Sequence, residues 1–323
     1  MSWFWSVDRT SAVMILVTFV GAGACLSGGG GAGKDTGDVD DASRGSSDGG
    51  NDSGSLGEGE GEGEGEGEGE GEGEGEGEGE GEGTVLPVAV CDVSPSLVVP
   101  PFGTATWDGS ASYDPEGHSI ETYSWVLVSS PTGSVVRLSS EMGPARSGFM
   151  PDIVGDYTAE LVVTTDDGRT SAPCQTTLES ATDQELWVEM FWTVSGDDMD
   201  LHVLAPGGSL ESATTDCYFA TCTSGMSWGT SSLLDDPHLV LDDIPGTGPE
   251  VTNIQTPDAG VFTVYVHDYP GSPYSGENSV TVRVYIENDL QYEGTKTVAG
   301  EDSYTAFASI DWSNSGSAAV SPL

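Results

Sequence analysis

The stretch Ser279-Val-Thr-Val-Arg-Val-Tyr-Ile286 places valine at every second position and is rich in β-branched and aromatic residues. This period of two is typical of a β-strand with one buried face. Similar runs occur at residues 160–164 and 261–266, and turn-forming clusters such as Asp114-Pro-Glu-Gly117 separate them. Helical periodicity is nowhere sustained. The pattern therefore predicts an all-β fold built of sandwiches.

The strand-like runs begin after residue 84 of the 323-residue chain. The remaining length of about 240 residues favours two compact domains in tandem over one. A polar stretch at residues 176–184 separates the runs into two groups. We therefore expect β-sandwiches at residues 85–178 and 183–313, with a disordered tail at residues 314–323.

The N-terminus has the pattern of an export signal. A charge-poor run from Ala12 to Val20 follows Arg9 and leads into four small residues. At about nine residues the run is too short to span a bilayer, so residues 1–24 are predicted to be a signal peptide. Gly21-Ala-Gly-Ala-Cys25 resembles the bacterial lipobox, which implies cleavage before Cys25 and acylation of its sulfur. Ala22-Gly-Ala24 also fits ordinary signal peptidase, which would give a periplasmic or secreted protein instead.

The cysteine count favours the lipid anchor. The chain contains 5 cysteines, an odd number. We expect disulfides between Cys91 and Cys174 and between Cys217 and Cys222. Cys25 then has no partner, as a lipidated cysteine requires, although a free or intermolecularly paired thiol is the alternative. The prediction is an exported lipoprotein of a bacterial outer membrane or cell surface.

Residues 25–84 are predicted to be a disordered linker. Gly and Glu alternate without a break from Gly57 to Glu82. A segment without apolar residues cannot offset the entropy of ordering, and the repeated carboxylates repel one another. The linker would hold the folded domains away from the membrane. The alternative is that the Glu array itself collects calcium or basic partners.

The charge balance excludes some partners. Residues 1–84 hold 20 of the 54 acidic and 3 of the 8 basic side chains, so 34 acidic and 5 basic side chains follow. The folded region is therefore strongly acidic, with a net charge of −29. Nucleic-acid binding requires a basic face, and docking onto anionic lipid through charge requires the same. The predicted contact with the membrane is through the lipid anchor alone, and the binding partner is an extracellular protein or glycan.

The first domain carries an ordered series of motifs. These are Pro87-Val-Ala-Val90, Trp107-Asp-Gly-Ser-Ala-Ser-Tyr-Asp-Pro-Glu-Gly117, Tyr123-Ser-Trp125, Pro151-Asp152 and Gly155-Asp-Tyr-Thr-Ala-Glu-Leu-Val-Val163. Together they resemble a PKD domain, which implies an immunoglobulin-like sandwich. Trp125 would then be a core residue and Tyr157 a tyrosine-corner residue. Asp108, Asp114 and Glu116 could bind calcium in their loop, or they could simply form turns.

The second domain carries another series of motifs. It contains Trp192-Thr-Val-Ser-Gly-Asp-Asp-Met-Asp-Leu-His-Val203, Asp216-Cys-Tyr218, Trp228-Gly229, Asp242-Asp243, Gly248-Pro-Glu250 and Gly260-Val-Phe-Thr-Val-Tyr-Val-His267. Residues 185–313 are similar to the YfaP-like family of bacterial domains of unknown function. Phe262 stands where that family usually has Tyr, and Leu241-Asp-Asp-Ile244 departs from its Asp-x-Asp element. The resemblance implies a β-sandwich and names no ligand.

The same motifs contain candidate metal ligands. Asp198, Asp200 and His202 alternate, so on a strand their side chains lie on one face. Carboxylate oxygens favour calcium, and Asp242, Asp243 or Glu250 could complete its shell. His202 and His267 raise the alternative of zinc. The third interpretation is structural, with the aspartates at a strand entry and His202 in a buried hydrogen bond.

The sequence gives little support for catalysis. No Gly-x-Ser-x-Gly elbow precedes a predicted helix, and no His-Glu-x-x-His occurs. We therefore expect a non-catalytic surface lipoprotein whose two sandwiches bind a protein or a carbohydrate, with calcium as the candidate stabilising ion. Trp228, Tyr269 and Tyr274, if exposed in loops, would suit sugar rings. The alternative function is a secreted hydrolase or an accessory module of a degradative enzyme.

Overall fold

The computed structural model describes residues 84–223, 225–244 and 246–323. These residues form seventeen strands and one short helical turn, α1 (Phe219–Cys222), which confirms the all-β prediction. The predictions for the signal peptide, Cys25 and the Gly/Glu linker fall on residues 1–83 and lie outside the described residues. Within the described ranges, no helix has the length and apolar character needed to cross a membrane.

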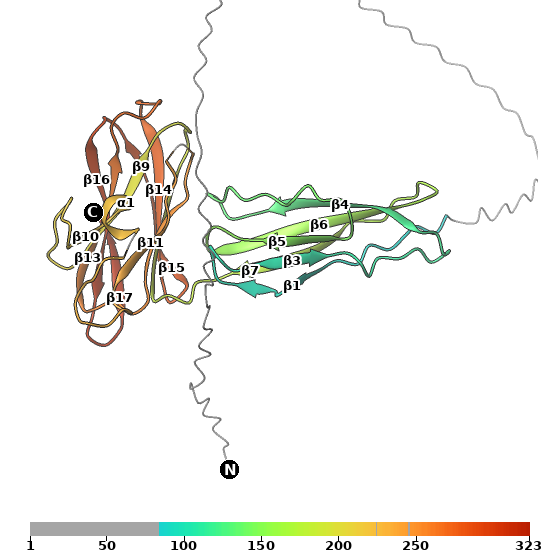
Figure 1. Cartoon of the computed structure of the whole chain (residues 1–323), viewed down its shortest axis with the longest axis horizontal. Helices are drawn as coiled ribbons and strands as arrows, with labels where there is room; N and C mark the ends of the chain where they lie inside the picture. The colour runs from blue at the N-terminus through green and yellow to red at the C-terminus, as the bar shows by residue number, and fades with distance from the viewer. Residues whose placement is uncertain (1–83, 224, 245) are drawn as a thin grey trace, which may run out of the picture. The chain divides into compact units, whose positions relative to one another are not determined.

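The first sandwich consists of two sheets (Figure 1). One sheet has the strand order β1-β3-β5 and the other has the order β2-β7-β6-β4. Only β2, beside β7, is parallel to its neighbour in this sandwich. The strands are β1 (Asp92–Ser94), β2 (Leu97–Val98), β3 (Ala105–Asp108), β4 (Ile120–Ser129), β5 (Ala145–Phe149), β6 (Gly155–Thr165) and β7 (Cys174–Ser180). Strand β7 extends two residues beyond the predicted domain limit of 178.

Alternation along β6 forms one wall of this core. Tyr157 and every second residue up to Thr165 are buried, as the valine-rich run predicts. Trp125 is buried as expected, and Trp107 is fully buried and packs edge-on against Phe149 at 5.6 Å between ring centroids. Large aromatic side chains therefore fill the space between the two sheets.

Tyr157 makes the contacts of a tyrosine corner. Its hydroxyl donates to Asp152 Oδ1 over 2.8 Å and accepts a hydrogen bond from the Ile153 backbone N–H over 3.3 Å. Burial, together with the nearby Asp152 carboxylate, raises the pKa of the Tyr157 hydroxyl far above its ordinary value. The hydroxyl therefore stays protonated and ties β6 to the chain that precedes it.

Both predicted disulfides are present. Cys91 and Cys174 bridge with Cα atoms 5.9 Å apart, and Cys217 and Cys222 bridge with Cα atoms 4.9 Å apart. The first bond connects the chain just before β1 with the start of β7, and the second closes the loop that contains α1.

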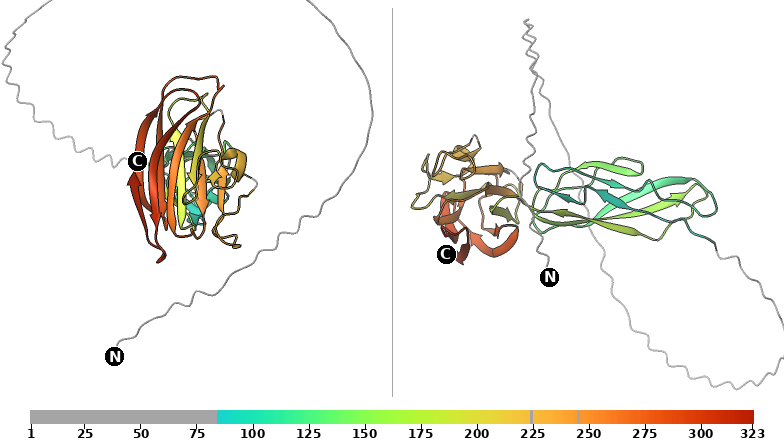
Figure 2. Two further views of the ribbon diagram at one scale, coloured as in Figure 1. Left: turned by 90° about the vertical axis from the view of Figure 1, so that its left-hand side faces the viewer. Right: turned by 90° about the horizontal axis from the view of Figure 1, so that it is seen from below.

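The second sandwich also consists of two sheets, whose strands can be followed from yellow to red in Figure 2. One sheet has the order β10-β9-β13-β16-β17 and the other has the order β11-β12-β8-β14-β15, and all their pairings are antiparallel. The strands are β8 (Leu186–Trp192), β9 (Met199–Leu204), β10 (Asp216–Cys217), β11 (Pro237–Leu241), β12 (Glu250–Ile254), β13 (Gly260–Asp268), β14 (Asn278–Ile286), β15 (Asp289–Val298), β16 (Ser303–Trp312) and β17 (Ala318–Pro322). Valines from β9, β13 and β14 lie in the core between the sheets.

The prediction of a disordered tail at residues 314–323 was wrong. Residues Ala318–Pro322 form β17, which pairs with β16 from Trp312 to Ala308. Ala318 and Val320 pack against the core, so the segment gains both backbone hydrogen bonds and apolar burial. The segment is too short, and too rich in Ala and Ser, for its sequence alone to indicate a strand.

Candidate metal centre

The central residues of the site lie on β9 and β13. Met199, Leu201 and Val203 point into the core, so Asp200 and His202 lie on the opposite face of the sheet, as the alternation predicts. His267 of β13 stands directly across from Asp200 in the antiparallel ladder. Directly opposed residues share a face, which brings both histidines and Asp200 together.

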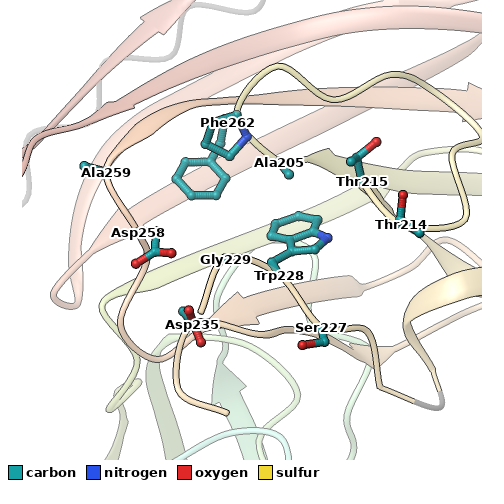
Figure 3. A pocket seen from close by; sticks show the side chains of 11 residues that line it. Ala205, Thr214, Thr215, Ser227, Trp228, Gly229, Asp235, Asp258, Ala259 and Phe262 are labelled. Atoms are coloured by element: carbon teal, nitrogen blue, oxygen red, sulfur yellow. The ribbon is translucent and has the colours of Figure 1, made fainter. Parts of the chain in front are cut away.

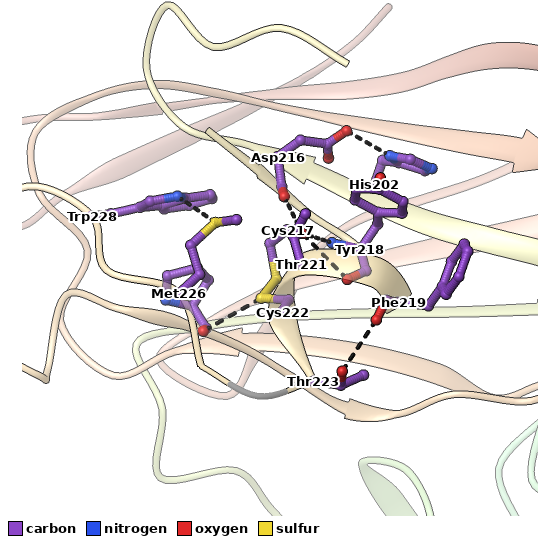
Figure 4. Close-up of a disulfide and its surroundings, with 11 residues drawn as sticks. His202, Asp216, Cys217, Tyr218, Phe219, Thr221, Cys222, Thr223, Met226 and Trp228 are labelled. Carbon is purple, nitrogen blue, oxygen red and sulfur yellow. Dashed lines mark hydrogen bonds and ion pairs between the residues drawn. A yellow bond between two sulfur atoms is a disulfide. The ribbon is translucent and has the colours of Figure 1, made fainter. Parts of the chain in front are cut away.

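Two aromatic rings cover this face. Tyr218 stacks on the His202 ring at 4.5 Å, and Tyr304 stacks on the His267 ring at 4.1 Å. Figure 4 shows that Tyr218 belongs to the loop closed by the Cys217–Cys222 disulfide. The cover leaves His202 fully buried and Asp200 and His267 only 3% and 4% exposed.

A set of carboxylates lies beside the histidines. Asp200, Asp242 and Glu250 each offer an oxygen, and the three oxygens lie within 4.8 Å of one another. Asp242 follows β11, and Glu250 is the first residue of β12. Both strands belong to the sheet that does not contain β9. Glu250 Oε2 accepts a hydrogen bond from the Leu201 N–H over 2.7 Å, which holds the carboxylate against β9. Strand β10 pairs with Val203 and Leu204 of β9 and does not reach Leu201. The set therefore joins the two sheets at their edge.

These carboxylates have no arginine or lysine partner among the described residues. The arginine ion pairs involve other acids, the described lysine bonds to backbone oxygens, and the basic group near the set is His267, whose Nδ1 atom lies 3.7 Å from Asp200 Oδ2. Burial, followed by repulsion from Asp200, raises the pKa of Asp198 to about 7. Burial and Asp200 also raise the pKa of Asp242 and raise that of Glu250 well above its usual range. Near neutral pH the cluster therefore needs either protons or a cation.

Not all the predicted calcium ligands are equivalent. Asp200, Asp242 and Glu250 come together, whereas Asp198 and Asp243 flank the set. Asp243 Oδ2 accepts a hydrogen bond from the Gly248 N–H over 2.8 Å, so this side chain holds the loop before β12. A Cβ atom on Gly246 would lie 2.0 Å from the same oxygen, which explains the glycine there.

The three acidic candidates of the first sandwich make turn contacts. Asp108 Oδ1 accepts from the Ser110 N–H, and Asp114 Oδ1 accepts from the Glu116 N–H. Arg169 forms ion pairs with both Asp114 and Glu116. These contacts favour the turn interpretation over a metal site in this loop.

The two histidines bond to further carboxylates that sequence reasoning did not select. His202 Nδ1 lies 2.8 Å from Asp216 Oδ2, and His267 Nε2 lies 3.3 Å from Asp302 Oδ1. Burial alone would lower the pKa of His267, but its contacts with Asp200 and Asp302 outweigh burial and raise it. Asp216 belonged to a quoted motif, whereas Asp302 carried no sequence signal because its proximity arises from the pairing of β13 with β16.

A separate hollow of about 370 Å³ has Trp228 and Phe262 among its lining residues (Figure 3). Trp228 is only 7% exposed and packs against Phe262 at 6.1 Å, so it belongs to the core and not to an exposed loop. Asp235 and Asp258 also line the hollow. Tyr269 is 39% exposed but packs against His267, so it lies with the histidines and does not line the hollow.

No protein-family model matches this chain, and no curated protein matches it. The resemblances to PKD and YfaP-like domains therefore stay predictions from the motifs.

Proposed function

We propose that this chain is a non-catalytic bacterial lipoprotein that presents two β-sandwich modules at the outer membrane or cell surface, where they bind a protein or a carbohydrate. The disulfides support the anchor, because they use Cys91, Cys174, Cys217 and Cys222 and leave Cys25 for acylation. The acidic segment before the sandwiches would act as a spacer. The PKD-like and YfaP-like motifs are consistent with extracellular modules.

The hollow beside Trp228 is the observation that carries the binding function. The exposed residues Pro206 and Ala259 offer apolar contact beside the nearly buried Trp228, and the exposed Asp258 offers a hydrogen-bond acceptor. A few polar groups in a mainly apolar concavity are typical of a binding site. Carboxylates of this kind can accept hydrogen bonds from sugar hydroxyls, or pair with a lysine or arginine of a protein.

Calcium is the proposed stabilising ion of the second sandwich. Asp200, Asp242 and Glu250 would supply oxygen ligands. The Oδ2 atom of Asp200 and the Oε1 atom of Glu250 are buried and have no hydrogen bond to any residue that the structure describes. Buried carboxylates without partners are costly unless a proton or cation neutralises them. Calcium prefers such hard oxygen ligands and tolerates irregular geometry.

The binding function can be tested with Asp258→Asn. Mature protein would be screened against immobilised glycans and casein, and the affinity of any ligand found would be measured by calorimetry. We expect Asp258→Asn to weaken binding by about tenfold, since a charged hydrogen bond contributes about 1.5 to 3 kcal/mol. The melting temperature should not change, because Asp258 is exposed. Asp156→Asn, an exposed change in the first sandwich, should leave the affinity unaltered.

Two outcomes would contradict this proposal. The first is equal binding by wild type and Asp258→Asn, which would remove the hollow as the site. The second is turnover of any screened substrate, which would favour the hydrolase alternative.

The anchor is tested by the intact mass of mature protein extracted from membranes. We expect loss of residues 1–24, added lipid mass on Cys25 and the loss of four hydrogens through two disulfides. Cys25→Ser should shift the protein to the soluble fraction. A mature chain without lipid would instead place the protein in the periplasm or the medium.

A further inference from the structure

We propose that Asp200, His202 and His267 form a binding site for a divalent transition metal, with zinc as the best-matched ion. This site overlaps the proposed calcium set, because Asp200 belongs to both. One ligand atom from each of the three residues lies within 4.8 Å of the others. Two imidazoles with one carboxylate are nitrogen-rich ligands that suit zinc, whereas calcium takes oxygen ligands.

His202 is oriented with one nitrogen free for a metal. Its Nδ1 atom lies 2.8 Å from Asp216 Oδ2, a contact that Figure 4 shows beside Tyr218. The Asp216 carboxylate also accepts a hydrogen bond from the Glu211 N–H over 2.7 Å, which fixes its position. A carboxylate accepts hydrogen bonds, so Nδ1 carries the proton, and Nε2 of the neutral ring then presents its lone pair.

The Nε2 atom of His202 is fully buried and has no hydrogen-bond partner among the described residues. A buried polar atom without a partner is destabilising, whether it is a bare acceptor or a protonated donor. A metal at this nitrogen would satisfy it. An imidazole whose other N–H is bound to a carboxylate is the usual arrangement of a zinc-ligating histidine.

His267 contacts its orienting carboxylate through the other ring nitrogen. Its Nε2 atom lies 3.3 Å from Asp302 Oδ1, so its Nδ1 atom is the nitrogen that remains for a metal. Nδ1 lies 3.7 Å from Asp200 Oδ2, which is too long for a hydrogen bond. Two ligands of one tetrahedral zinc lie about 3.3 Å apart, given bonds of about 2.0 to 2.1 Å. The observed spacing therefore suits an ion between the two atoms.

Asp200 supplies the third ligand. Its Oδ2 atom is buried and accepts no hydrogen bond from the described residues, as expected for an oxygen positioned to bind a cation. Three protein ligands leave a fourth zinc position for another donor. Tyr218 and Tyr304 stack on the two imidazoles and keep the ring orientations fixed.

The test is a zinc titration of the mature protein after dialysis against a chelator, followed by calorimetry without calcium, because both ions would use Asp200. We expect one zinc per chain. His267→Gln should abolish this binding, while His238→Gln, an exposed histidine of the same sandwich, should leave it unchanged. Asp216→Asn keeps all three ligands but should weaken zinc binding by about 10- to 100-fold, as loss of an orienting partner does.

The calcium set provides an independent control. A double variant with Asp242→Asn and Glu250→Gln should still bind one zinc, which separates failure of this site from failure of the calcium site. X-ray absorption of the zinc-loaded wild type should give two imidazole nitrogens at about 2.0 to 2.1 Å, a result that needs no variant to fold. An oxygen-only shell, or no zinc bound, would overturn the proposal.

Discussion

Replacing Cys91 and Cys174 together by serine is expected to lower the free energy of unfolding of the first sandwich by about 4 kcal/mol. The bond joins residues separated by 83 positions, so the reduced chain gains considerable entropy in the unfolded state. In urea, where the slope is about 1 to 3 kcal/mol per molar, the midpoint of unfolding should fall by about 2 M. Chemical denaturation followed by tryptophan fluorescence would measure this shift.

The second disulfide provides the control for this prediction. Cys217 and Cys222 are separated by only 5 positions, so the same chain-entropy model gives about 2 kcal/mol for the double serine variant. The loss should affect the second sandwich and leave the unfolding of the first unchanged. Equal losses from the two pairs would contradict the entropic explanation.

The β-architecture and the disulfides could be predicted because their signals are local or few. Period-two alternation identified β6, β13 and β14, which carry buried side chains at every second position over much of their length. Four cysteines in two well-separated pairs left few sensible pairings. The same alternation placed Asp200 and His202 on one face of β9, as the structure has them.

The surroundings of the candidate metal ligands could not be predicted, because they depend on long-range pairing. Asp302 reaches His267 only because β16 pairs with β13, and Tyr304 stacks on the same ring for that reason. Trp228 lies in a loop by sequence, yet it packs into the core. A sequence gives no direct measure of which loop folds back over a sheet.

Calcium is expected to stabilise the second sandwich by about 2.7 kcal/mol when its concentration is about 100 times the dissociation constant. Extracellular calcium modules have dissociation constants of about 0.1 to 1 mM, so 10 mM is a suitable concentration for the tighter end of this range. The ion would neutralise Asp200, Asp242 and Glu250, which have no arginine or lysine partner in the described part of the chain. Thermal unfolding with calcium and with a chelator would measure the difference.

The stabilisation by calcium should increase as the pH rises. Burial raises the pKa of Asp198 to about 7 and raises the pKa of both Asp242 and Glu250. These groups bind protons more tightly in the folded state than in the unfolded state. Without metal, their contribution to the free energy of unfolding is therefore fully present below about pH 4 and is lost as the pH rises towards 7. Calcium replaces the protons at higher pH, so its stabilisation should be largest above pH 7 and should vanish near pH 4.

Neutral amides isolate the cause of this pH dependence. The double variant with Asp242→Asn and Glu250→Gln keeps the side-chain shapes but removes two charges, so it should unfold at the same temperature with and without calcium. At pH 8 and without metal, we expect it to be more stable than the wild type, because two unpartnered charges are gone. Asp311→Asn with Glu277→Gln removes two exposed charges from the same sandwich and should retain the full calcium response. If calcium still raises the unfolding temperature of the Asp242→Asn, Glu250→Gln variant, the ion binds elsewhere. If calcium stabilises the Asp311→Asn, Glu277→Gln variant but not that one, the response is assigned to Asp242 and Glu250.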